Sequence, residues 1–392
     1  MSSITLIENG EVYAPQYLGR KNILIGGETI LEIGSSDSRA LSGIDINVID
    51  ASGKIVIPGF IDGHVHICGG GGEGGFRTRT PEISLSDLTL AGVTSVIGVL
   101  GTDGTTRTMS NLIAKANALI EEGISAWVLT GSYQVPVRTV TGSITDDIIL
   151  IERIIGTGEI ALADHRSSHP GLDTLVKVVS DSRLGGILSG KGGIVNVHMG
   201  DSSKMTGLLN RLFEETEIPP GQILPTHMNR NPYLFEAAKE YVGKGGYADF
   251  TTSTTEQFIK EGEVPAAEAL KRMLDEELPV DRITFTSDGQ GSLPEFDSQG
   301  RFLRLGIGSC RSLGETLQTA VQEFDIDLSV ALKPLTANPA AIHKLKGKGE
   351  LKAGNDADIL LLSKESLEID SVIARGRLMV RGGEPVVKGT FE

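Results

Sequence analysis

PGFIDGHVHICGGGGEGG, residues 58–75, begins as a short apolar strand and ends in a run of glycines. Side chains alternate along a strand, so His64 and His66 face the same side and can converge on one ligand. Glycines 69–72 allow the backbone to approach a bound molecule closely. The segment therefore predicts a buried strand with a binding site at its end.

The pattern that follows this segment predicts a barrel. From about residue 58 to about residue 345, short apolar runs alternate with amphipathic stretches, which is typical of parallel βα units. Helical spacing is clear in residues 108–123, 232–246 and 265–279. The eight strand candidates are FIDGHVHI, VTSVIGVLG, SAWVLTGSY, IERIIGTGEI, GGIVNVHMG, QILPTHMN, YADFTTS and RITFTSDG. Eight units favour a (β/α)8 TIM barrel, with an open doubly wound sheet as the alternative because periodicity does not show closure.

The two ends of the chain have a different pattern. Residues 1–57 and 346–392 contain short strand-like runs separated by turn signals. The termini of a domain commonly lie close together. We therefore expect a small β-sandwich domain made of residues 1–57 and 346–392, with the hydrolase barrel of residues 58–345 inserted between them.

Composition narrows the class of partner. The formal net charge is -15 and no basic run stands out, so nucleic acid and an anionic membrane are poor candidates. The sequence has two cysteines, no secretory leader pattern at residue 1 and no apolar run of about 20 residues. We expect a cytoplasmic protein that acts on a small substrate.

Histidines gather at the ends of the predicted strands. Four of the seven are placed in this way: His64, His66, His198 and His227. Asp288 follows the eighth strand, and the carboxyl ends of barrel strands share one face. A single histidine is more often a hydrogen-bonded core residue, but five potential ligands at matching ends predict a metal site. The other three histidines lack this placement and are expected to be structural: His165, His169 and His343.

Several segments together resemble the isoaspartyl dipeptidases of the amidohydrolase superfamily. They are PGFIDGHVHICGGGGEGG, GTD at 101–103, GSYQVP, ADHRSS, HMG, THMNRN, SDGQGS and TANPAAIHKLKGKGELKAGNDADILLL. The resemblance covers essentially the whole chain. It implies a homo-oligomeric metallopeptidase that opens the β-aspartyl amide bond of dipeptides by attack of a metal-activated hydroxide.

The resemblance also implies two divalent metal ions, which imidazole and oxygen ligands suit best as Zn2+. The residues that match the two ligand sets are His64, His66 and Asp288 for the first ion, and His198 and His227 for the second. Where the family has a bridging carbamylated lysine, this chain has Glu159. We expect Glu159 to bridge the ions. Its carboxyl carbon lies closer to the backbone than that of a lysine carbamate, so the strand or the ions must shift; one filled or weakly held site is the alternative.

Catalytic and substrate-binding roles follow from the same resemblance. Asp288 is the expected general base and then acid, and Tyr133 is expected to stabilise the oxyanion. Glu73 matches the residue that receives the α-ammonium, and the two arginines offer planar forks for carboxylates. The positions matched to substrate binding are Gly71, Glu73, Thr102, Arg166, Arg230 and Ser292.

Two other functions remain open at this point. One is an amidohydrolase acting on a cyclic amide, as dihydroorotases and hydantoinases do, or on an N-acyl amino acid. A neutral ring would need none of Glu73, Arg166 and Arg230, which favours the dipeptide. The other is a noncatalytic binding protein, and the five intact histidine and aspartate ligands count against it.

Overall fold

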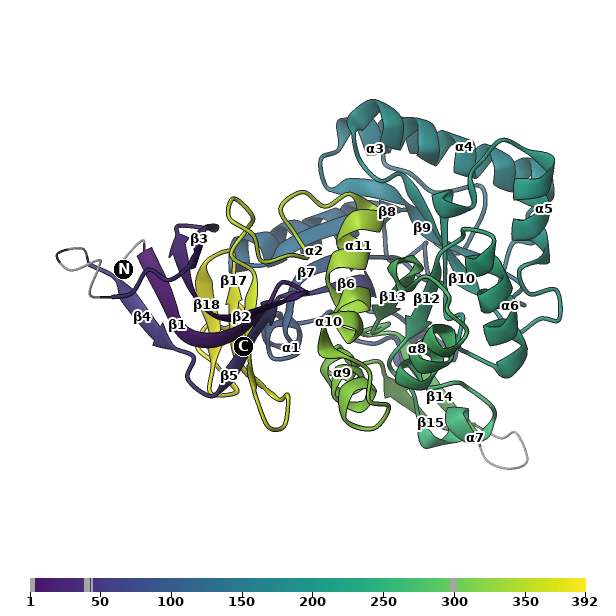
Figure 1. Ribbon diagram of the computed structural model, residues 1–392. Helices are drawn as coiled ribbons and strands as arrows, with labels where there is room; N and C mark the ends of the chain where they lie inside the picture. The colour runs from purple at the N-terminus through teal and green to yellow at the C-terminus, as the bar shows by residue number, and fades with distance from the viewer. Residues whose placement is uncertain (1–3, 39–42, 44, 297–301) are drawn as a thin grey trace.

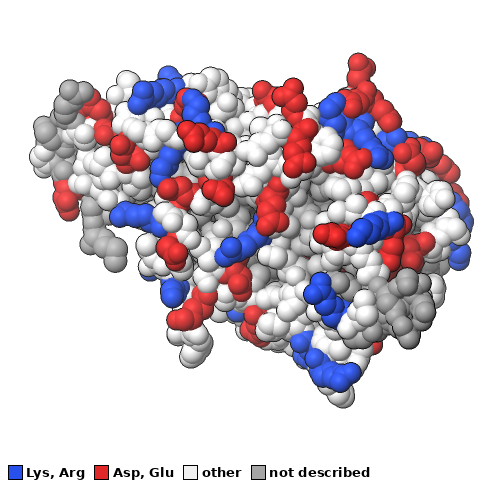
Figure 2. Space-filling model, turned by 90° about the horizontal axis from the view of Figure 1, so that it is seen from below, with Lys and Arg blue, Asp and Glu red and all other residues white. Residues whose placement is uncertain are grey.

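The structure is a computed structural model that describes residues 4–38, 43, 45–296 and 302–392. Figure 1 shows a strand-rich part that holds both ends of the chain and a larger part in which helices surround a row of strands. Among the residues described, no helix has the length and apolarity needed to cross a membrane. On the face seen in Figure 2, acidic and basic side chains are interspersed.

Strands from both ends of the chain share one mixed sheet. They are β1 (Ile4–Tyr13), β2 (Tyr17–Gly26), β3 (Thr29–Gly34), β4 (Asn47–Asp50), β5 (Lys54–Pro58), β16 (Ile359–Ser363), β17 (Ile369–Ala374), β18 (Arg377–Arg381) and β19 (Glu384–Pro385). The order is β19-β18-β17-β16-β5-β1-β2-β3, with β4 beside β1. The two ends meet where β5 pairs antiparallel with β16, with Ile57 opposite Leu360.

This sheet curls on itself. Its apolar cluster combines Ile30 of β3 with Ile373 of β17, although these strands lie far apart in the sheet order. The turn at Gly376 approaches the β2–β3 turn so closely that a Cβ there would lie 1.9 Å from the Gly27 carbonyl oxygen. The described strands thus belong to one continuous sheet that curls around its own core, which agrees in part with the predicted β-sandwich made of both chain ends.

The second part contains the eight predicted parallel strands. They are β6 (Phe60–Val65), β7 (Val93–Gly98), β8 (Ser125–Thr130), β9 (Ile154–Leu162), β10 (Ile194–Met199), β11 (Ile223–Thr226), β12 (Ala248–Thr251) and β13 (Ile283–Thr286). β6 to β11 form one parallel sheet in sequence order, and β12 pairs with β13. Met228 N donates to Asp249 O at 3.1 Å, and His66 N donates to Gly289 O at 2.9 Å. These bonds join the two groups at both edges, an arrangement that fits a TIM barrel.

Helices follow the strands and pack outside them (Figure 1). They are α1 (Leu85–Thr89), α2 (Met109–Glu122), α3 (Ile144–Leu150), α4 (Leu172–Ser189), α5 (Gly207–Glu215), α6 (Pro232–Gly243), α7 (Glu256–Lys260), α8 (Ala266–Asp275), α9 (Ser312–Gln322), α10 (Leu328–Ala331) and α11 (Ala337–His343). α6 begins where the Asn231 side chain accepts from Leu234 N, with Pro232 in the first turn. α2 buries Leu112, Ala116 and Leu119, which recur at helical spacing. A hairpin of β14 (Ser292–Phe296) and β15 (Phe302–Ile307) follows β13.

Candidate active site

A cavity of about 800 Å3 lies at the carboxyl ends of the barrel strands. Its lining comes from the segments that follow the strands, including His66 after β6, His227 after β11 and Asp288 after β13. His227 and Asp288 have positive φ angles of 64° and 52°. Such strained backbone at non-glycine residues is common at functional sites, and here it occurs at two predicted metal ligands.

His64 and His66 converge on Asp288, as their spacing predicts. His66 Nε2 lies 3.1 Å from Asp288 Oδ1, and His64 Nε2 lies 3.8 Å from the same oxygen. The Asn196 side chain meets His64 Nδ1 at 3.0 Å, so Nε2 is the nitrogen directed at the carboxylates.

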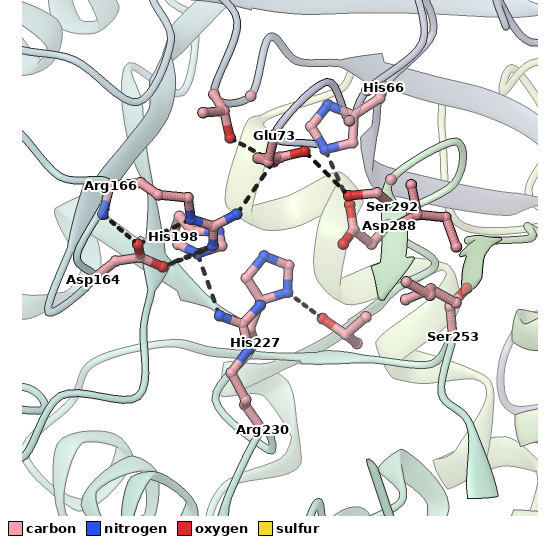
Figure 3. Close-up of a pocket in the computed structure, with 18 of the residues that line it drawn as sticks. His66, Glu73, Asp164, Arg166, His198, His227, Arg230, Ser253, Asp288 and Ser292 are labelled. Carbon is pink, nitrogen blue, oxygen red and sulfur yellow. Dashed lines mark hydrogen bonds and ion pairs between the residues drawn. The ribbon is translucent and has the colours of Figure 1, made fainter. Parts of the chain in front are cut away.

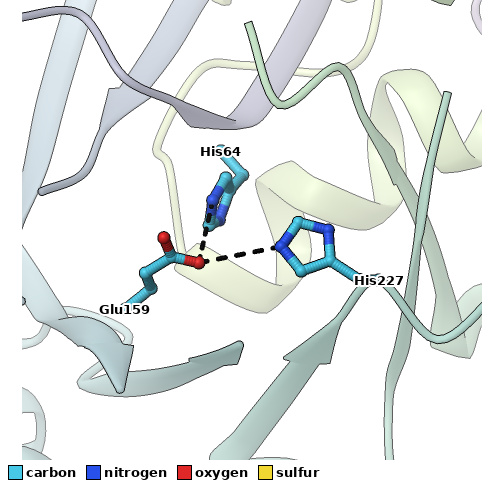
Figure 4. Close-up of side chains that lie close together, drawn as sticks. All are labelled: His64, Glu159 and His227. Atoms are coloured by element: carbon cyan, nitrogen blue, oxygen red, sulfur yellow. Dashed lines mark ion pairs between the residues drawn. The ribbon is translucent and has the colours of Figure 1, made fainter. Parts of the chain in front are cut away.

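Glu159, on β9, lies among all four predicted histidine ligands. Its Oε2 is 3.2 Å from His64 Nε2, 3.3 Å from His198 Nδ1 and 3.8 Å from His227 Nε2. Its Oε1 is 3.7 Å from His66 Nε2. Figure 4 shows one carboxylate oxygen of Glu159 facing both His64 and His227. The residue that replaces the expected lysine therefore stands in the middle of the cluster.

The cluster contains buried polar atoms that lack a hydrogen bond among the described residues. They are His64 Nε2, His66 Nδ1, Asp288 Oδ1 and both carboxylate oxygens of Glu159. Buried polar atoms are rarely left unsatisfied, and several facing one another fit a bound cation. Two groups offer ligand atoms within 4.8 Å of one another: His64, His66 and Asp288, and His64, Glu159 and His227. Imidazole nitrogens and carboxylate oxygens are suitable ligands for a divalent metal ion.

The second group differs from the predicted one in one member. His198 was expected to pair with His227, yet His198 belongs to neither group. It stands at the edge of the cluster, with Nδ1 near Glu159 and also 2.9 Å from the Tyr133 hydroxyl. The hydroxyl of Tyr133 occupies part of the space that this nitrogen faces.

The charges of the cluster match its geometry. Burial alone would lower the pKa of His64, but the Glu159 carboxylate raises it to about 10. The carboxylate therefore favours a positive charge at this position. Burial and the neighbouring Arg230 lower the pKa of His227 to about 3, which keeps that imidazole neutral. Against burial, His66 and the other imidazoles hold the pKa of Asp288 below its usual range, so it is ionised.

Asp164 is a member of the site that the sequence analysis missed. Its Oδ2 lies 3.0 Å from His198 Nε2 and 2.8 Å from Arg166 Nη2. Hydrogen bonds from both partners hold its pKa low despite burial. The available signal was its position two residues before Arg166 in ADHRSS. Asn196 and Thr251, which contact His64 and His227, carried no such signal.

Three of the predicted substrate-binding residues surround Glu73, and Figure 3 shows two of them, Arg166 and Ser292. Glu73 Oε1 accepts from Thr102 Oγ1 at 2.8 Å and from Arg166 Nη1 at 3.2 Å. Ser292 Oγ donates to Oε2 at 3.4 Å. Gly71 has φ +65°, and a Cβ there would lie 2.6 Å from the Thr78 carbonyl oxygen, so a side chain is excluded.

Arg230 joins the site from the segment after β11. Its Nη1 donates to Met199 O at 3.1 Å and lies 3.3 Å from His198 Nε2. All predicted site residues except His64 and Glu159 line the cavity. Glu159 and His64 are fully buried, and they contact the lining residues His198 and Asp288 respectively.

The three histidines expected to be structural stand outside both ligand groups. His165 has a side chain that is 87% exposed and lies at the rim of the cavity. His343 is buried at the end of α11, and neither ring nitrogen has a hydrogen bond among the described residues.

Comparisons with known proteins relate the chain to amidohydrolases. Two family models, both described as amidohydrolase family, match residues 47–114 and 226–379. Dihydroorotase from Staphylococcus epidermidis is 43% identical over 68 residues, which span 17% of this chain and 16% of that enzyme. The match thus covers about a sixth of that relative.

Solved structures resemble the chain over nearly its full length. A β-aspartyl dipeptidase from Fervidobacterium islandicum AW-1, crystallised with the dipeptide β-Asp-Leu, is 42% identical, with a TM-score of 0.89. The similarity covers 97% of this chain and 98% of that one. A D-hydantoinase from Thermus sp. is 18% identical with a TM-score of 0.67, covers 98% and 97% of the two chains, and shows the shared fold. The chain is a hydrolytic enzyme and belongs to the β-aspartyl dipeptidase family of the amidohydrolases.

Proposed function

We propose that this enzyme hydrolyses the isoaspartyl amide bond of dipeptides. The observation that carries the proposal is the position of Glu73, whose carboxylate faces Arg166, Thr102 and Ser292 in the cavity that also holds the histidine cluster. A β-aspartyl dipeptide has an ammonium and two carboxylates, and Glu73, Arg166 and Arg230 all line this cavity, where they could receive these groups. The solved relative crystallised with β-Asp-Leu supports the same substrate.

We propose two divalent metal ions, with Zn2+ as the preferred metal. His64, His66 and Asp288 would hold one ion, and His198 and His227 the other, with Glu159 between them. The unsatisfied buried atoms of His64, His66, Asp288 and Glu159 support the first ion and the bridge, and the grouping of His227 with His64 and Glu159 supports His227 as a ligand. When bound, such ions lower the pKa of a shared water and polarise the scissile carbonyl.

The protein's own side chains then have distinct tasks. Asp288, ionised and in the cavity, accepts the proton of the attacking water and returns it to the departing amine. Burial and Glu159 raise the pKa of Tyr133 well above its ordinary value, so its hydroxyl keeps a proton to donate to the oxyanion. Arg166 and Arg230 bind the substrate carboxylates, and Glu73 binds its α-ammonium.

The decisive experiment pairs metal analysis with turnover. Purified protein is assayed with β-Asp-Leu, α-Asp-Leu and dihydroorotate, and its zinc content is measured. We expect zinc and turnover of β-Asp-Leu alone. Turnover of dihydroorotate without β-Asp-Leu would favour the cyclic-amide alternative, and Glu73→Gln with unchanged kcat/KM for β-Asp-Leu would remove the ammonium-binding role.

We also propose a domain organisation for the chain. Residues 58–345 would form a closed (β/α)8 barrel, inserted into a small β-sandwich domain of residues 1–57 and 346–392. The hydrogen bonds that join β13 to β6 and β11 to β12 support closure. The curl of the terminal sheet around its own apolar cluster supports the sandwich.

A further inference from the structure

The segment that carries Glu73 folds back on itself. We name residues 69–80 the Glu73 loop. Within it, Thr80 N donates to Gly70 O at 3.0 Å, and Gly72 N donates to Thr78 O at 3.2 Å. The contacts of the Glu73 carboxylate come from Thr102, Arg166 and Ser292, which lie outside the loop. The position of the carboxylate therefore depends on how the loop is anchored.

Arg107 anchors both ends of the Glu73 loop. Its Nε donates to Cys68 O at 3.0 Å, just before the loop, and its Nη2 donates to Thr80 O at 3.2 Å. Arg107 is only 3% exposed. Its third nitrogen, Nη1, has no hydrogen bond among the described residues and lies 3.6 Å from Asp103 Oδ2. A buried guanidinium needs a nearby counter-charge, and Asp103 supplies it.

Asp103 also binds a residue of the Glu73 loop itself, Arg79. Arg79 Nη1 donates to Asp103 Oδ2 at 2.8 Å. The other carboxylate oxygen accepts from Thr105 N at 3.0 Å and Thr106 N at 2.8 Å. Burial opposes ionisation, but the hydrogen bonds from Thr106 and Thr105, together with Arg79, lower the pKa of Asp103 to about 2. The carboxylate is charged throughout the neutral range.

The same segment supplies a direct contact to Glu73. Thr102, the residue before Asp103, donates its hydroxyl to Glu73 Oε1. Asp103 therefore fixes the segment that contacts Glu73 and, at the same time, both arginines that fix the Glu73 loop. A shift of the Thr102 segment or of either arginine would move the Glu73 carboxylate relative to the cavity.

Resting on the proposed function, we propose that Asp103 is a positioning residue that acts through Arg79 and Arg107. It holds Glu73 where the substrate's α-ammonium arrives, and so sets the preference for β-aspartyl compounds over succinyl compounds that lack this ammonium. Asp103 lines the same cavity, but its contacts among the described residues are with Arg79, Arg107, Thr105 and Thr106, and none is with the histidine cluster or the Glu73 carboxylate.

The test compares two ligands that differ by one amino group. β-Asp-Leu is the substrate, and N-succinyl-leucine, which lacks the α-ammonium, serves as a competitive inhibitor. In Asp103→Asn we expect the KM for β-Asp-Leu to rise about ten-fold or more, because a small displacement of a binding group has large effects. The Ki of N-succinyl-leucine should change less than about two-fold. Equal changes in both constants, or a change in neither, would overturn the proposal.

A second variant tests the route through Arg79. Arg79→Gln should raise the same KM, and Asp103→Asn combined with Arg79→Gln should be no worse than the more severe single change, because the two side chains act as a unit. Full additivity would contradict this route. Asp181→Asn, which breaks an exposed pair with Lys177 on α4, is the matched control and should leave both constants unchanged.

Two further measurements distinguish a failure of this proposal from misfolding of the variant and from a failure of the proposed function. The zinc content and the thermal midpoint of Asp103→Asn should match those of the wild type. A fall in either quantity, together with equal losses of affinity for β-Asp-Leu and N-succinyl-leucine, would assign Asp103 a structural role instead. If the wild type hydrolyses β-Asp-Leu but Asp103→Asn matches it, only the positioning role fails. If the wild type does not hydrolyse β-Asp-Leu, the proposed function fails, and the positioning role fails with it.

Discussion

Glu159 Oε2 lies 3.2 Å from His64 Nε2, with both side chains fully buried and neither atom hydrogen-bonded among the described residues. A charged carboxylate in such a place needs a positive partner. Four imidazoles surround the carboxylate at nitrogen–oxygen distances between 3.2 and 3.8 Å, and neither of its oxygens has a hydrogen bond among the described residues.

Glu159→Ala should lower the amount of metal bound and reduce kcat/KM for β-Asp-Leu by about a hundred-fold or more, since the anion between the ligand sets is gone. Metal analysis after dialysis, followed by turnover, checks this. Glu121→Ala, on the exposed face of α2, is the control. A Glu159→Ala enzyme with two ions and full activity would refute the bridge.

Asp164→Asn should reduce kcat/KM about ten- to hundred-fold, because Asp164 orients the His198 ring and pairs with Arg166. The isosteric amide keeps the shape and removes the charge. Zinc affinity, measured by competition with a chelator, should fall in parallel. Unchanged affinity and unchanged turnover would show that His198 needs no such partner.

Tyr133→Phe should lower kcat by about a hundred- to a thousand-fold with little change in KM, if its hydroxyl donates only to the developing oxyanion. Steady-state kinetics with β-Asp-Leu separates the two constants. Tyr241→Phe removes a hydroxyl that donates to Pro220 O, and neither residue lines the cavity, so this variant should keep wild-type kinetics. A rise in KM alone would assign Tyr133 to ground-state binding.

His343 should make the protein less stable in mild acid. Burial lowers its pKa from the ordinary 6.5 to about 4 in the folded chain. Between these values the unfolded chain binds a proton that the folded chain does not, so the free energy of unfolding falls as the pH falls from about 6.5 towards 4. Urea unfolding at pH 7.5 and pH 5 measures this effect. The free energy of unfolding should fall less between these two pH values in His343→Leu than in the wild type.

The control for this measurement is His165→Leu, because that side chain is 87% exposed. It should follow the wild-type pH dependence. If His343→Leu followed it as well, the buried imidazole would not be the source of the acid sensitivity.

Much of the barrel was predictable because its signal is local. Each of the eight strands coincides with a predicted apolar run, and α2 (Met109–Glu122) lies within the predicted 108–123. The helix predicted over 232–246 ends at Gly243. The prediction followed the spacing of apolar residues, which does not register that Gly245 and Gly246 disfavour a helix. His64 and His66 point together because strand parity requires it.

The rest depends on contacts between distant segments. Asn196 contacts His64 although the two residues are 132 positions apart in the sequence, and nothing in the sequence around either residue predicts this contact. Alternating residues cannot distinguish two packed sheets from one sheet that curls, so the detailed form of the terminal sheet was not predictable. Which nitrogen of His198 faces Glu159 is likewise set by Asp164 and Tyr133, from other segments.

The pairing of β5 with β16 has a consequence for synthesis on the ribosome. β5 needs a neighbour on each side, and one of them begins only at Ile359. β5 is therefore made early but gains its second strand neighbour only after β16 has been synthesised. Until then the edge of β5 is exposed to any other unpaired strand, so nascent chains cut short before Ile359 should be the most aggregation-prone form of this enzyme.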